Sequence, residues 1–278
     1  MKWIAPIVIF AALAGCTSKN EAQPSGTPQI DTGSARMGHA THEADHGSGA
    51  TAMLMVESEP VEAKAAQPTT LRLMIHEASG AMVKDFEQLQ EQKVHLIIAS
   101  EGLDQFAHVH PQIDLTGTMT TVFSFPTGGK YRLYADYQPT GKGPAVAISE
   151  MKIAGETPRA PDLKPNAPGQ IKGDGLSADV SIDDSKANGA TRIVFRLLDA
   201  SGTSVVDLQP YMGAMGHLVI ISADGKQYVH AHSKDKKATD GKVEFEAHIM
   251  KPGIYKAWGQ FQREGAVRIV PFVMEKTL

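Results

Sequence analysis

The sequence contains an internal repeat, and this repeat constrains the fold more than any other feature. When the chain is shifted against itself by 122 residues, about a dozen of roughly thirty-five ungapped positions carry identical residues. The matches begin with Ala78-Ser79-Gly80 on Ala200-Ser201-Gly202 and end with His110 on His232. After a short indel, Gly129-Lys130-Tyr131 matches Gly253-Ile254-Tyr255. One module of about 100 residues is therefore expected to fold twice.

The patterning within each module is that of short β-strands. Residues 70–75 alternate between apolar and polar side chains, and residues 94–100, 117–125 and 130–137 do so less strictly. Turn signals separate these runs, and about seven short strands at this spacing favour a β-sandwich. We predict an all-β protein with two tandem Ig-like or cupredoxin-like β-sandwich domains, at residues 51–155 and 175–278.

The strand register brings three histidines together in the second module. Residues 216–222 and 227–232 flank Ala223-Asp224-Gly225-Lys226, and Asp-Gly between alternating runs predicts a two-residue type I′ turn. His217 would then lie opposite His232, and Val219 opposite His230. Because side chains alternate between the faces of a sheet, all three histidines would share one face.

The first module repeats this arrangement. Gly102-Leu103 is predicted to form a type II′ turn, which places His95 opposite His110 with His108 on the same face. The spacing His-x12-His-x-His thus occurs in both modules.

Three converging imidazoles suit copper or zinc and leave one coordination position open. The sequence predicts one metal site from His217, His230 and His232, and a second from His95, His108 and His110. Met215 lies two residues before His217, and its thioether would favour copper, above all Cu(I), with zinc as the alternative. The competing interpretations are hydrogen-bonded structural histidines for both triads and flexible core filling for Met215.

The N-terminal residues have the pattern of an export signal. Lys2 precedes an apolar run over residues 3–14, which is too short for a transmembrane helix and typical of a signal peptide. Leu13-Ala14-Gly15-Cys16 resembles the lipobox of bacterial lipoproteins. This resemblance implies a signal peptide at 1–15, cleavage before Cys16 and attachment there of lipid with acyl chains such as palmitate. The protein would face the periplasm or cell exterior, on the outer membrane in a Gram-negative cell.

Two stretches lack the pattern of a folded domain. Residues 16–50 are rich in Ser, Gly, Thr, Ala and Pro and are predicted to be a flexible tether. Within the tether, His39, His42 and His46 are either auxiliary metal ligands or part of a solvated spacer. Residues 156–174 are predicted to be a Pro-rich linker between the modules.

Composition excludes several functional classes. A single cysteine excludes a disulfide framework within the chain, a Cys-rich zinc module and an iron–sulfur cluster. With 27 basic and 31 acidic residues and no basic cluster among aromatics, no nucleic-acid partner is expected. The sequence also lacks a nucleophile elbow, a phosphate loop and a dinucleotide fingerprint, so an enzyme is not predicted.

Two phrases in each module resemble a known group of proteins. In the first module they are residues 106–111 and 129–134, and in the second they are residues 213–218 and 258–261. They are similar to bacterial secreted proteins with YtkA-like β-sandwich domains that are associated with heavy metals, often copper. The resemblance implies an association with copper. Together with the lipobox and the histidine triads, it leads us to predict a lipid-anchored metal-binding protein for copper storage, delivery or tolerance, with a metal-transfer protein as partner. The alternative is a structural or adhesive lipoprotein that binds a protein partner.

Overall fold

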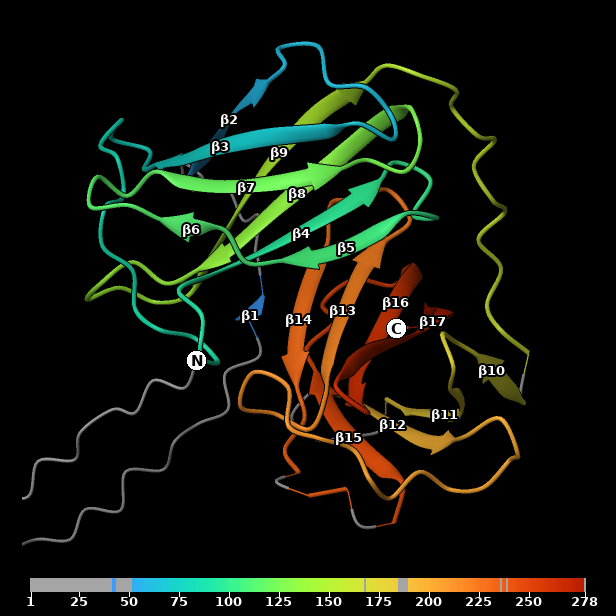
Figure 1. The fold of residues 1–278 in the computed structure, drawn as a ribbon. Coiled ribbons are helices and arrows are strands. Elements are labelled where there is room, and N and C mark those ends of the chain that lie inside the picture. Colours follow the sequence, from blue (N-terminus) through green and yellow to red (C-terminus); the bar gives the residue numbers. More distant parts are fainter. Residues whose placement is uncertain are drawn as a thin grey trace, which may run out of the picture. The chain divides into compact units, whose positions relative to one another are not determined.

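The computed structural model describes residues 42–43, 52–167, 169–184, 190–235, 237–238 and 240–277. Residues His39–Leu278 form one compact unit. The described residues form strands β1 to β17 and contain no helix, so the predicted all-β class is confirmed (Figure 1). Among these residues, accordingly, no helix is long and apolar enough to cross a membrane.

The first module is one sheet of eight strands in the order β5-β4-β8-β9-β2-β3-β7-β6. A short parallel pairing of β2 with β9 joins the two layers of this sandwich. Its core includes Leu71, Leu73, Ile98 and Leu133. The strands are β2 (Met53–Glu59), β3 (Pro68–His76), β4 (Val94–Ser100), β5 (Phe106–Val109), β6 (Gln112–Ile113), β7 (Met119–Ser124), β8 (Gly129–Tyr137) and β9 (Ala145–Ile153).

The second module is a sandwich of two sheets, ordered β10-β11-β12-β15 and β1-β14-β13-β16-β17. Its core is rich in aromatic side chains, among them Phe195, Phe245, Phe261 and Phe272. The short strand β1 (His42–Glu43) extends the second sheet along the edge of β14. The remaining strands are β10 (Gln170–Lys172), β11 (Ser177–Asp183), β12 (Thr191–Leu198), β13 (His217–Ser222), β14 (Tyr228–His232), β15 (Lys242–Ala247), β16 (Gly253–Arg263) and β17 (Ala266–Lys276).

The two modules pack against each other through equivalent sheets. Strands β4 and β13 are buried at every position, because each has a packed layer on both faces. On β13, Leu218 and Ile220 face the core of their own sandwich. The alternate residues Val219 and Ile221 belong to a third apolar cluster that also contains Ile97 of β4. The outer faces of β4 and β13 therefore form an interface between the modules.

The predicted register of both hairpins is correct, whereas the predicted turn types are wrong. A type I′ turn needs positive φ at both central residues, but Gly225 has φ +72° and Asp224 is not in that region. The amide of Gly225 donates to the carbonyl of Ser222 at 2.7 Å, which gives a four-residue loop over 223–226. In the first module Leu103 takes the left-handed position, with φ +57°, instead of Gly102.

Candidate metal centre

Each hairpin carries its three histidines on one face, as the pairing requires. His217 lies opposite His232 and Val219 opposite His230 in the β13–β14 pair. In the first module His95 is the second residue of β4, His108 lies on β5 and His110 directly follows β5. In each triad, one ring nitrogen per histidine lies within 4.8 Å of the other two.

The first triad forms a nearly equilateral triangle of nitrogens. His95 Nδ1 lies 3.0 Å from His108 Nε2, and His110 Nε2 lies 3.2 Å from each of these atoms. In the second triad, His217 Nδ1 lies 3.3 Å from His230 Nε2. The nitrogens of the first triad therefore surround a common centre, and those of the second lie close enough together to share one ion.

Backbone carbonyls fix the orientation of the first histidine in each triad. His95 Nε2 donates to the carbonyl of Leu89 at 3.0 Å, and His217 Nε2 donates to that of Tyr211 at 2.9 Å. Because a carbonyl only accepts, these nitrogens carry the proton, and the Nδ1 atoms that face the centre present lone pairs. Leu89 and Tyr211 are equivalent in the repeat and begin tight turns, in which Gln90 and Met212 have positive φ.

The central histidine of each triad is oriented by a residue of the other module. His108 Nδ1 donates to Gln260 Oε1 at 3.0 Å, and His230 Nδ1 donates to Asp136 Oδ2 at 2.9 Å. Both bonds leave the Nε2 atom to face the centre. A second hydrogen bond of this kind fixes the tautomer of a metal-ligating histidine.

Asp136 and Gln260 are the functional residues that the sequence interpretation missed. They occupy equivalent positions, because Asp136 of β8 pairs with His95 of β4, and Gln260 of β16 pairs with His217 of β13. Both side chains are buried. The available signal was a polar residue at the same point of two matched strands, seven residues after each matched glycine of the repeat.

Burial keeps these histidines neutral. It lowers the pKa of His95 and places that of His108 well below its ordinary value, to which the neighbouring histidines contribute. Burial likewise lowers the pKa of His110 to about 3 and that of His217 to about 4. Neutral imidazole is the form that binds a metal ion, so these side chains are ready to bind across the neutral and mildly acidic range.

The two triads form a single cluster of six rings. The ring centroids of His95 and His230, from different modules, are 5.1 Å apart, and those of His108 and His230 are 5.2 Å apart. Within the triads the same measure ranges from 4.5 Å for His230–His232 to 5.5 Å for His217–His230. Rings from opposite modules are thus as close as rings of one hairpin.

Of the other predicted ligands, Met215 does not join the cluster. The buried side chain of Met215 packs with the hydrophobic core of the second sandwich, because its backbone precedes β13 and does not continue the alternation of that strand. The backbone of His42 pairs opposite His230. His39, His46 and the predicted lipid site Cys16 lie outside the described residues.

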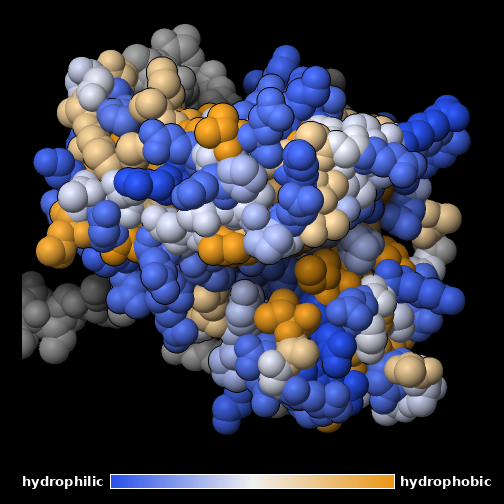
Figure 2. Space-filling view, turned by 45° about the horizontal axis from the view of Figure 1, so that its top comes forward, coloured by the Kyte–Doolittle hydropathy of each residue, from blue (hydrophilic) through white to orange (hydrophobic). Residues whose placement is uncertain are grey.

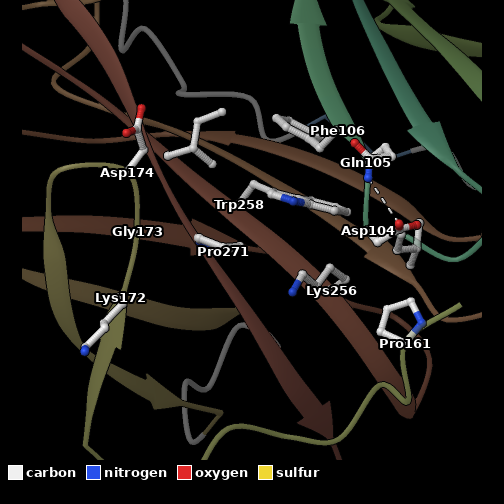
Figure 3. A pocket seen from close by; sticks show the side chains of 12 residues that line it. Asp104, Gln105, Phe106, Pro161, Lys172, Gly173, Asp174, Lys256, Trp258 and Pro271 are labelled. Atoms are coloured by element: carbon white, nitrogen blue, oxygen red, sulfur yellow. Dashed lines mark hydrogen bonds between the residues drawn. The ribbon is translucent and has the colours of Figure 1, made fainter. Parts of the chain in front are cut away.

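A cavity of about 530 Å³ is lined by residues of both modules, such as Asp104 of the first and Pro271 of the second (Figure 3). Its wall includes Phe106 and Trp258, whose rings stack with centroids 4.5 Å apart. Phe106 precedes His108 by two residues and Trp258 precedes Gln260 by two, so this stack adjoins the His108–Gln260 pair on the same strand faces. Burial lowers the pKa of Lys256, which also lines the cavity.

Comparison with protein families gives the chain a place but no activity. Residues 48–151 and 170–277 each match the family described as a domain of unknown function, DUF8832. The chain belongs to this family. Two consecutive matches also confirm the duplication that the repeat predicts. Because the family is defined without a function, the chemistry must be inferred from the site itself.

Similar solved structures are remote. The Escherichia coli adhesin FdeC is 15% identical, with a TM-score of 0.26, and the match covers 83% of this chain and 65% of that one. A bacterial ice-binding adhesin is 8% identical, with a TM-score of 0.27 and the same two coverages. The integrin-binding protein invasin is 14% identical, with a TM-score of 0.23 and coverages of 80% and 39%. The chain spans less than two thirds of each. No curated protein matches it.

Proposed function

We propose that this protein binds metal ions in the cell envelope, with copper as the favoured metal and zinc as the alternative. The observation that carries the proposal is the set of three nitrogens, from His95, His108 and His110, that face one another at 3.0–3.2 Å. Lone pairs cannot satisfy one another, so such a triangle is favourable only around a shared cation or proton.

The dimensions of the triangle support a metal ion. Nitrogens bound at about 2.0–2.1 Å to one tetrahedral ion lie about 3.3–3.4 Å apart. The observed edges are slightly shorter and need only a small outward movement of the rings. Three protein ligands leave a fourth position open, through which an ion can pass to a partner.

The electrostatics of the site support an ion of low charge. The ligands are neutral imidazoles, and Asp136 supplies a buried carboxylate to His230. Transfer of a cation into a buried site costs more as its charge rises. Cu(I) therefore suits the donor set better than a divalent ion. Met215 lies in the hydrophobic core, so its thioether does not contribute to this preference.

The remaining parts of the proposal rest on the sequence. We place the protein on a membrane through lipid at Cys16, facing the periplasm or exterior, with a metal-transfer protein as its partner. The resemblance of residues 106–111 to YtkA-like proteins supports metal storage, delivery or tolerance as the role.

Equilibrium dialysis of the full chain in detergent against Cu(I), Cu(II) and Zn(II) tests the proposal. The triple substitution His39→Ala/His42→Ala/His46→Ala is used as the background, so that tether histidines add no metal. In this background the triad variant His108→Ala/His110→Ala should take up less metal, because it lacks two of the three nitrogens of the triangle. The matched control, His76→Ala/His248→Ala, removes two histidines outside the cluster and should retain it.

Equal metal uptake by the triad variant and its control would overturn the proposal. The alternative would then be a tandem β-sandwich lipoprotein that binds a protein partner and uses its histidines only for packing. On the face seen in Figure 2, hydrophobic residues form separate patches among hydrophilic ones. That face offers no single broad apolar surface for such a partner.

A further inference from the structure

The interface between the modules has an approximate two-fold symmetry. The Phe106–Trp258 stack has its counterpart in the stack of Tyr228 on Tyr134, whose centroids are 5.1 Å apart. Bonds from the central histidines to Gln260 and Asp136 are the second equivalent pair. An interface of this kind brings the same surface of each copy face to face. The equivalent rings of His108 and His230 are 5.2 Å apart, so the two triads lie close to the two-fold axis and meet there.

We propose that the two triads bind two metal ions as one dinuclear centre. This inference rests on the proposed function, and it adds that the sites are coupled and not independent. Its basis is the contact between modules: the rings of His95 and His230 are 5.1 Å apart, within the range found inside a triad. Ions held by the two triads would therefore be close neighbours with little solvent between them.

The two proposed metal positions, one in each triad, differ in burial. His217, His230 and His232 are all buried, whereas His108 and His110 are only partly so. The second-module position is consequently closed, and the first-module position is open to exchange with solvent or with a small exogenous ligand.

The two positions are also unequal in charge. His230 donates to a carboxylate, but the equivalent His108 donates to a neutral amide. A carboxylate partner makes the imidazole a stronger ligand and offsets the charge of the ion. The second-module triad should therefore fill first, and the first-module triad second.

The proposed coupling between the two ions predicts how one bound ion changes the affinity for the other. Two positive charges held in neighbouring triads repel each other even with an effective dielectric constant near 20. We expect the second ion to bind at least tenfold more weakly than the first-module triad would bind an ion alone. Removal of the ligands in the second module should thus tighten binding in the first, which independent sites cannot do.

The experiment is a Cu(I) titration of the full chain, in the background without tether histidines, against a chelator of known affinity. The parent should bind two ions in two steps. His108→Ala/His110→Ala should bind one ion at the affinity of the first step. His230→Ala/His232→Ala should bind one ion at least tenfold more tightly than the second step of the parent.

A measurement on the parent alone keeps the test independent of how the variants fold. Protein loaded with two equivalents of Cu(II) should give a half-field EPR signal, because neighbouring ions couple magnetically. Two ions without this signal, together with unchanged affinities in the variants, would refute the dinuclear centre while the proposed function stands. One ion per chain would refute it as well. No uptake by any protein would overturn the proposed function itself.

Discussion

Acid should destabilise the metal-free protein through its buried histidines. The pKa of His217 falls to about 4 in the folded chain, because its ring is fully buried. An unfolded histidine titrates near 6.5. Below that value the unfolded chain binds a proton at this ring and the folded chain does not, so the free energy of unfolding decreases as the pH falls.

The magnitude follows from the width of this window. Each such histidine lowers the free energy of unfolding by about 1.4 kcal/mol per pH unit between its unfolded and folded pKa values. For His217 alone, a decrease from pH 6.5 to 4.5 costs about 2 kcal/mol. The pKa values of His95 and His108 are lowered as well, and the total stability of a domain is only about 5–15 kcal/mol. The metal-free protein is therefore expected to unfold at mildly acidic pH.

Urea unfolding of the metal-free chain, followed by tryptophan fluorescence at pH 7.5, 6.5, 5.5 and 4.5, measures this effect. Stability should be flat above pH 6.5 and should fall steeply below it. His217→Gln removes one titrating ring and should reduce the slope, with His248→Gln outside the cluster as the matched control. A free energy of unfolding that stays constant down to pH 4.5 would refute the conclusion that the imidazoles are neutral when folded.

Three further substitutions have defined outcomes. Asp136→Asn removes the carboxylate from His230 and should weaken Cu(I) binding at the second-module triad by about 10- to 100-fold; a chelator titration showing unchanged affinity would deny Asp136 this role. Glu264→Asn should raise the free energy of unfolding by about 0.5–1 kcal/mol, since Glu264 and Gly265 both have positive φ in a two-residue hairpin and Asn-Gly suits such a turn; a lower melting temperature would contradict this. Gly259→Ala should destabilise the second sandwich by about 1–3 kcal/mol, because the new Cβ would lie 2.7 Å from the ring of Phe195; denaturant unfolding with an unchanged midpoint would show that the ring can move away.

The hairpins were predictable from the sequence because their register depends on local information. Turn residues and alternating side chains were sufficient to pair His217 with His232. The turn geometry was less accessible, since Leu103 adopts a backbone region that favours glycine. The buried side chain of Leu103 packs in the third apolar cluster and holds the backbone in this region, and the local sequence does not reveal that packing.

The meeting of the two triads was not predictable from either module alone. Nothing in the alternation of β4 or β13 indicates that the face with the histidines is covered by the other module. The wholly apolar run from Leu96 to Ala99 was compatible with a strand buried on both sides, but it did not identify the covering layer. Met215 illustrates the converse. It lies two residues before His217, which in a continuous strand would place both side chains on one face, but β13 begins only at His217.

The exchange of hydrogen bonds between the modules has a consequence for how such a protein can change over time. In a homodimer of single modules, both copies of position 136 would have to be the same residue, so a carboxylate on one side would impose a carboxylate on the other. Fusion into one polypeptide releases that restriction, and here one position is Asp136 while its equivalent is Gln260. Tandem duplication thus permits a specialised half and a permissive half within a frame that stays nearly symmetric.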